Sequence, residues 1–175
     1  MKSKNLVALA LLAGMGVVLH TITPGIIMGM KPDMMLTMMF LGIILFPDKK
    51  SVLLMGLVTG LLSALTTTFP GGQFPNIIDK LVTAFIFFGL LMLLKKVPMQ
   101  PLVCTILTGV GTIISGIIFL SSAYFIVGLP DAFLAMFALG VLPAAGFNIV
   151  LIIILYPIAQ SISKRTKLNE QTIQS

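Results

Sequence analysis

The segment LVCTILTGVGTIISGIIFLSSAYFIV, residues 102–127, decides the fold class, because its 26 consecutive positions contain no charged side chain. At about 1.5 Å per residue, a helix of this length reaches roughly 39 Å, which exceeds the ~30 Å hydrocarbon core of a bilayer. Within a bilayer each backbone N–H and C=O needs a partner inside the protein, and a helix provides these partners along its own length. The segment is therefore predicted to be a tilted transmembrane helix.

The composition of the whole chain agrees with that interpretation. Of the 175 residues, 58% are apolar and 9% are charged, whereas soluble domains carry about 45–50% apolar and ~25% charged residues. Such a chain cannot cover a water-facing globule with polar side chains. We therefore expect an integral membrane protein with no room for a separate soluble domain.

Five other apolar runs complete the predicted fold. They predict further helices at residues 6–22, 32–46, 51–68, 76–94 and 132–163. The last run contains Pro143 and Pro157, so it should kink near Pro143 or begin with a separate short helix over 132–139. The prediction is an all-α integral membrane protein, a single domain of six transmembrane helices over 1–163 followed by a short polar tail, 164–175.

The basic residues indicate the orientation of this bundle. Of the eleven Lys and Arg, only Lys31 and Lys80 fall on one side of the six spans. The other nine fall on the opposite side, at positions 2, 4, 49, 50, 95, 96, 164, 165 and 167. Because basic residues collect on the cytoplasmic side, both termini are expected in the cytoplasm. The net charge of +6 thus reflects topology, and we expect no nucleic-acid partner.

The chain has few residues suited to enzymatic chemistry. It contains one His (His20), one Cys (Cys104) and five Asp or Glu, too few for a usual metal cluster, catalytic triad or disulfide framework. The phosphate-binding motif G-x-x-x-x-G-K-[ST] does not occur in the sequence. We expect no enzyme, no metal and no cofactor, and any uphill transport would need another protein or an ion gradient.

Polar residues of both charge signs gather in the connections on the outer side. They are His20, Lys31, Asp33, Asn76, Asp79 and Lys80. This set suits a zwitterion such as an amino acid, whose carboxylate needs a cation or a helix N-terminus and whose ammonium needs a carboxylate. The alternative is that these residues only cap helices, since Asp79 follows Asn76 by three residues as in a capping box.

Two further features lie within the predicted helices. Met30, Met34 and Met38 recur every four residues, which places them on one helix face. Thioethers make favourable contacts with aromatic rings, so this row suits an aromatic ligand, although ordinary packing or a Cu(I) path would use the same residues. Asn148 is a lone amide in the last span, where it either ties two helices together or contacts a ligand.

Four short strings carry a family resemblance. MKPDMM at 30–35, PNIIDK at 75–80, IVGLP at 126–130 and VLPAA at 141–145 resemble the TrpP family of tryptophan transport proteins of Gram-positive bacteria. The likeness covers nearly the whole chain and implies a multi-pass protein of the bacterial cell membrane that takes up tryptophan. That family resembles the substrate-binding (S) components of energy-coupling-factor transporters, which work with a transmembrane coupling subunit and two ATPases.

The resemblance implies contacts to the indole ring. The methionine row would flank the ring, and Phe74 would stack on it. The indole N–H would be accepted by His20 or by Asn148. These roles follow from tryptophan as the ligand, and the residues alone leave open another aromatic or vitamin-like molecule, or a permease for Cu(I) built on the methionines.

The resemblance also implies contacts to the head group and to a partner. The carboxylate would meet Lys31 or Lys80, and the ammonium would meet Asp33 or Asp79. S components dock their coupling subunit through alanines spaced by four on the first helix. That helix here offers a pair of small residues with this spacing, Ala10 and Gly14, so close approach by a partner helix is possible. Dependence on an ATPase module and independent action both stay open.

Overall fold

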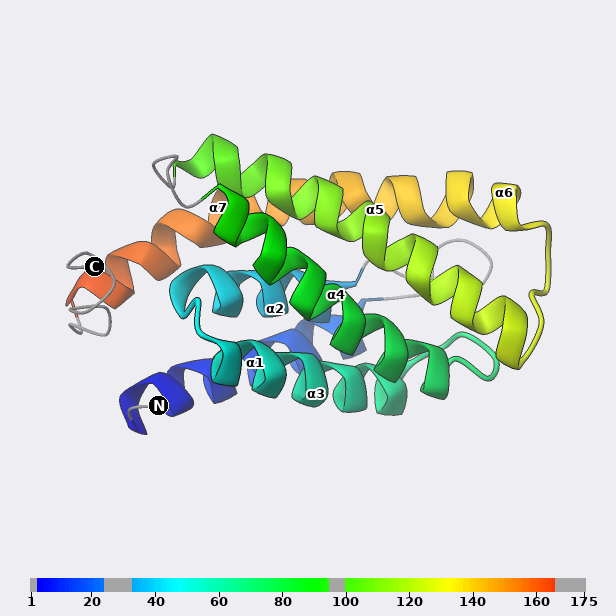
Figure 1. Ribbon diagram of the computed structural model, residues 1–175, viewed down its shortest axis with the longest axis horizontal. Helices are drawn as coiled ribbons and strands as arrows, with labels where there is room; N and C mark the ends of the chain where they lie inside the picture. Colours follow the sequence, from blue (N-terminus) through cyan, green and yellow to red (C-terminus); the bar gives the residue numbers. More distant parts are fainter. Residues whose placement is uncertain (1–2, 24–32, 95–99, 166–175) are drawn as a thin grey trace.

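The computed structural model describes residues 3–23, 33–94 and 100–165 as an all-helical bundle (Figure 1). Its elements are α1 (Ser3–Ile22), α2 (Met34–Leu45), α3 (Lys49–Thr66), α4 (Gln73–Leu93), α5 (Pro101–Ile126), α6 (Phe133–Met136), η1 (Phe137–Val141) and α7 (Leu142–Arg165). No strand occurs in the described ranges, and five helical stretches are long and apolar enough to cross a membrane. The predicted all-α membrane fold is confirmed.

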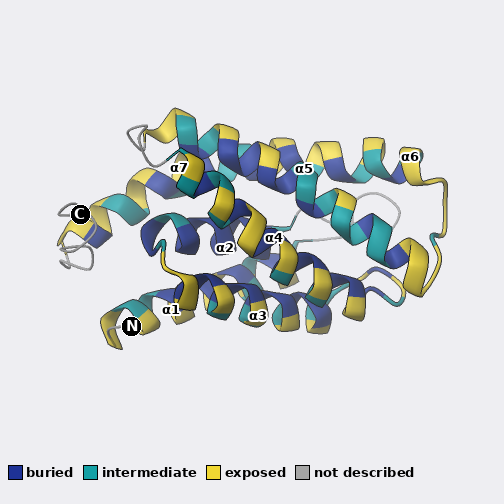
Figure 2. Ribbon diagram, in the orientation of Figure 1, coloured by how far each residue is buried: buried dark blue, intermediate teal, exposed yellow. Residues whose placement is uncertain are grey.

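The short second helix lies at the centre of the bundle. α2 has 12 residues, about 18 Å at 1.5 Å per residue, and packs against α1, α3, α4, α5 and α7. Eleven of these residues are buried, so α2 is dark along nearly its whole length in Figure 2, whereas the surrounding helices present exposed side chains outward. A helix that is apolar on all sides belongs in a protein interior, and here the other helices provide that interior.

The last span is continuous across the position where a kink or a separate helix was expected. α6, η1 and α7 form one helical stretch, Phe133–Arg165, of 33 residues. η1 is a π turn, in which the N–H of Leu142 donates to the carbonyl of Phe137 five residues earlier. It ends just before Pro143, whose ring removes a backbone donor and crowds the preceding turn. The irregularity is therefore a wide turn, and residues 132–139 do not form a helix of their own.

Glycines let the third and fourth helices approach closely. A Cβ on Gly56 would lie 3.3 Å from the Cα of Leu81, and one on Gly60 would lie 3.3 Å from the Cα of Ile77. Small residues allow such backbone approach between membrane helices. This contact fixes the position of the α4 turn that contains Lys80.

The bundle has two distinct ends. The start of α1 and the end of α7 lie together at one end, and the α3–α4 and α5–α6 connections lie at the other (Figure 1). Five stretches long enough to cross a membrane and the shorter apolar helix α2 together make six, the number of spans that the sequence predicted. The described members of the polar set, His20, Asp33, Asn76, Asp79 and Lys80, lie toward the end that holds the α3–α4 connection.

Candidate functional site

A pocket opens among the helices on the side of the α3–α4 connection. It is lined by the end of α1, the start of α2, residues 67–69, and parts of α4, α5, η1 and α7. Its cavity volume is about 90 Å³, measured as the space open to the centre of a water-sized sphere. One water needs roughly 10–15 Å³ on this measure, so the pocket has room for a small ligand group or several waters.

A buried ion network forms one wall of this pocket. The Nζ of Lys80 lies 2.6 Å from Oδ2 of Asp33 and 2.5 Å from Oδ2 of Asp79. The side chain of Lys80 is only 2% exposed. An ammonium has three N–H donors, so two of them meet these carboxylates. The network joins the start of α2 to α4, and all three residues line the pocket.

Asp79 is the most enclosed member of the network. Its carboxylate accepts hydrogen bonds from the hydroxyls of Thr83 at 2.8 Å and Ser115 at 2.9 Å, in addition to Lys80. The predicted capping box is wrong, because α4 begins at Gln73 and Asp79 lies in its second turn. Asn76 also lies inside the helix, where its side-chain amide donates to the carbonyl of Gly72 at 2.7 Å.

Asp33 combines the two roles that the sequence left open. As the N-cap of α2, it accepts the backbone N–H of Leu36 at 3.1 Å. The same carboxylate pairs with Lys80, and its Oδ1 lies 3.9 Å from Nδ1 of His20 at the end of α1. Its side chain is 21% exposed, against 1% for Asp79. Asp33 is therefore the acid of the network that a ligand can reach.

Asn148 lies directly behind the pocket wall. Its side-chain amide donates to the hydroxyl of Thr112 at 3.2 Å, and Thr112 lines the pocket. Its Oδ1 is buried and has no hydrogen-bond partner among the described residues. An Asn side chain has two donors and an acceptor with two lone pairs, so most of its capacity is unused. The side-chain hydrogen bond of Asn148 therefore ties α7 to α5, and its Oδ1 remains available as an acceptor next to the pocket.

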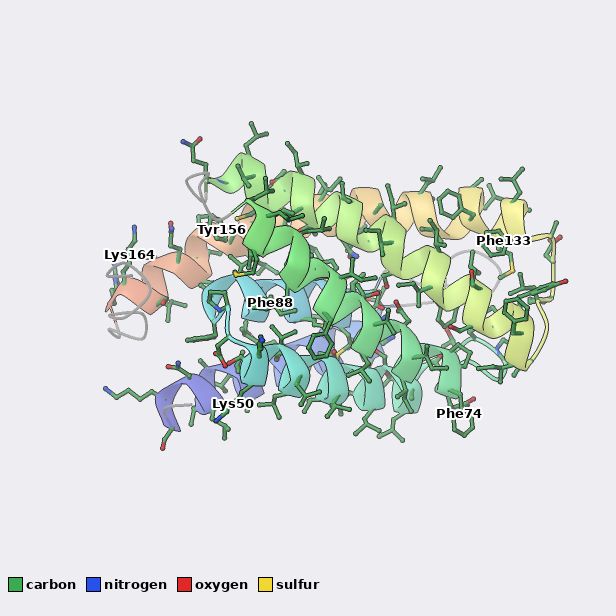
Figure 3. All side chains as sticks on the ribbon, viewed as in Figure 1. Lys50, Phe74, Phe88, Phe133, Tyr156 and Lys164 are labelled. Atoms are coloured by element: carbon green, nitrogen blue, oxygen red, sulfur yellow. The ribbon has the colours of Figure 1, made fainter. Side chains whose placement is uncertain are left out.

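The described members of the methionine row, Met34 and Met38, and Phe74 do not line the pocket. Met34 and Met38 are buried in the core, where a Cβ on Gly16 of α1 would meet Met38, and neither lines the pocket. This favours the packing interpretation of the row for its described members. Met30 and Lys31 lie outside the described residues. Phe74 is 68% exposed and points away from the bundle (Figure 3).

The sequence interpretation missed the aromatic residues of the pocket. Phe69 and Phe119 both line it, with their rings edge to face and their centroids 5.2 Å apart. Thr112 and Ser115 of α5 also line the pocket, and the sequence analysis did not single them out. The signal for these two was their spacing, since residues three apart on a helix share a face.

Two small residues of the first helix, spaced by four, face outward. Ala10 and Gly14 are exposed, and no atom lies within 4 Å of a Cβ placed on Gly14. This face of α1 is open to close approach by another helix. Among the described ranges, no group of three or more His, Cys, Asp and Glu is arranged to hold a metal ion.

Comparison with known proteins gives a consistent result. The family model described as "Tryptophan transporter TrpP" matches residues 2–164. The chain is 56% identical over 170 residues to a probable tryptophan transport protein of Bacillus subtilis (strain 168), covering 97% of this chain and 98% of the relative. It is 49% identical over 150 residues to a protein of the same description from Clostridium acetobutylicum, covering 86% and 88%. No solved structure matches the chain.

Proposed function

This chain belongs to the TrpP family of tryptophan transporters, and we propose that it binds tryptophan in the pocket beside the ion network and takes part in its uptake. The pocket faces outward, both termini lie in the cytoplasm of a bacterial cell, and no bond of the ligand changes. The described residues form one membrane domain, with the polar tail 164–175 after it. The observation that carries the proposal is a buried pocket with charges of both signs.

The ion network supports a ligand-binding role over a purely structural one. Removing three charged groups from water costs several kcal/mol per ion, and mutual attraction offsets this only with very good geometry. Ionisable groups within membrane segments are rare and mark substrate or ion pathways. Lys80, Asp33 and Asp79 face a pocket as well as one another. A zwitterionic amino-acid head group fits such a wall.

The remaining lining supplies surface for an aromatic side chain. Leu36, Phe69, Phe119, Val141 and Ala144 give the pocket apolar and aromatic walls. Aromatic pairs add about 0.5–1.5 kcal/mol beyond area burial, so an indole ring gains from such a wall. For the indole N–H, two acceptors remain candidates, His20 in the lining and Asn148 just behind it.

Uphill uptake needs a source of energy from outside this chain. The sequence has no phosphate-binding loop of its own. We propose that the exposed face of α1 with Ala10 and Gly14 contacts a transmembrane coupling subunit that works with two ATPases. This part rests on the resemblance to S components and on the open helix face. Uptake that persists in cells lacking all energy-coupling ATPases would replace this model with coupling to an ion gradient.

Tryptophan fluorescence tests the binding proposal directly. The chain contains no Trp and two Tyr, so the indole emission in a titration comes from the ligand. We expect a blue shift of the emission and a rise in anisotropy when tryptophan is added to the purified protein. Displacement of bound tryptophan by non-fluorescent competitors then ranks the affinities of other ligands. No change up to millimolar tryptophan would refute the proposal. Tighter binding of another aromatic or vitamin-like ring would favour the alternative substrate.

A further inference from the structure

The ion network contains more negative than positive groups. Two carboxylates, Asp33 and Asp79, share one ammonium, Lys80. Lys80 has three N–H donors, of which the two carboxylates take two. Its side chain lines the pocket although it is almost fully buried. The third donor is therefore the contact that the lysine of the described pocket lining offers to a ligand anion.

The two carboxylates are not equivalent toward a ligand. Asp79 is 1% exposed and already accepts bonds from Lys80, Thr83 and Ser115. A carboxylate has about four acceptor positions, so Asp79 is nearly saturated. Asp33 is 21% exposed and has spare capacity. A ligand ammonium would meet Asp33, while Asp79 holds Lys80 in place.

We propose that Lys80 determines the chemical class of the ligand, so that the pocket accepts an amino acid and rejects the corresponding amine. The inference rests on the proposed function and deepens it. Lys80 binds the ligand carboxylate through its third donor, Asp33 binds the ligand ammonium, and Asp79 is a positioning residue for Lys80. An amine would leave the third donor of Lys80 unpaired, which is costly in a buried site.

Three fluorescent ligands separate these contacts. Tryptophan carries both charges, tryptamine only the ammonium, and indole-3-propionate only the carboxylate, while all three share the indole. We expect the wild-type protein to bind tryptophan at least about tenfold more tightly than either of the others, because one charge-assisted hydrogen bond is worth roughly that factor. Equal affinity for tryptophan and tryptamine would overturn the inference with no variant needed.

A variant with unchanged net charge isolates the role of Lys80. The double substitution Lys80→Met with Asp79→Asn removes one positive and one negative charge and leaves Asp33 as the acid of the network. We expect it to reverse the preference, so that tryptamine binds more tightly than tryptophan. A variant that keeps the wild-type order of ligands would refute the inference, while tryptophan binding by the wild type would still support the proposed function.

A matched control excludes a general effect of losing a lysine. Lys50 is exposed at the other end of the bundle, in the first turn of α3 (Figure 3). Lys50→Met is expected to keep the wild-type affinities for all three ligands. If no ligand binds even to the wild type, the proposed function itself fails. If the double variant does not fold, the single substitution Asp79→Asn takes its place: because Lys80 is then held less firmly, tryptophan should lose more affinity than tryptamine, and equal losses would refute the inference.

Discussion

Gly60 of α3 faces Lys80 of α4, and a Cβ on Gly60 would lie 3.4 Å from the Cβ of Lys80. The same Cβ would lie 3.3 Å from the Cα of Ile77. The glycine therefore lets the α4 backbone come close enough for the Lys80 ammonium to reach both carboxylates. A residue that touches no ligand thus fixes the geometry of the ion network.

Replacing this glycine should disturb the site. In the variant Gly60→Leu, the added side chain meets backbone atoms of α4, and overpacking of this kind costs about 1–3 kcal/mol. We expect lower thermal stability and weaker tryptophan binding. Gly89→Leu, on the exposed part of α4 where no atom lies within 4 Å, should leave both unchanged. Unaltered binding in Gly60→Leu would mean that the network tolerates displacement of α4.

Asp33→Asn separates the two roles of Asp33. Asn is as good an N-cap as Asp, so α2 should keep its cap, whereas loss of the ion pair with the buried Lys80 should lower the melting temperature. Loss of the charge should weaken tryptophan binding by roughly tenfold or more, as measured by ligand fluorescence. The control is Asp131→Asn, at an exposed acid outside the pocket. Equal affinity in the two variants would leave Asp33 with the capping role alone.

Phe119→Ala tests the aromatic wall. Loss of this ring removes one partner of the edge-to-face pair with Phe69. We expect tryptophan affinity to fall by roughly tenfold, since an aromatic contact contributes about 0.5–1.5 kcal/mol beyond the buried area. Phe74→Ala removes a ring of the same size that points away from the bundle. A larger effect from Phe74 than from Phe119 would restore Phe74 as the stacking partner.

Asn148→Leu tests the buried acceptor. Leu has a similar volume but no acceptor, so a ligand with an N–H should lose affinity and a ligand without one should not. We expect tryptophan to bind several-fold more weakly while 1-methyltryptophan is unaffected by the substitution. Ser63→Ala is the control, because Ser63 is also buried with a hydroxyl that has no partner in the described part of the chain, but it does not line the pocket. Equal losses for both ligands would assign Asn148 to tying α5 and α7 together.

The ion network was partly predictable from topology. Helix ends on one side of a membrane come together, so Asp33, Asp79 and Lys80 were grouped correctly by their predicted side. Their depth was not predictable, because Asn76 and Gln73 are both reasonable starts for α4. The residue at which α4 begins also decides where Phe74 lies. With Gln73 as the first residue of the helix, Phe74 faces outward, and Phe69 of the preceding connection lines the pocket instead.

The methionine row shows the limit of periodicity. The spacing of Met34 and Met38 correctly places them on one face of a helix, but α2 is buried on every face. When all faces of a helix are enclosed, the pattern of apolar residues no longer indicates which one meets a cavity. Only the packing of the neighbouring helices decides which face meets the cavity. Here Asp33 and Leu36 line the pocket.

The π turn Phe137–Val141 places one more residue in a helical turn than an α-helix would. Each residue turns an α-helix by about 100°, so the faces before and after the π turn are out of phase by roughly that angle. Deleting one residue there would rotate Phe133–Met136 relative to Asn148 without breaking the helix. The face that Phe133–Met136 presents is thus set separately from the face of α7 that packs on α5.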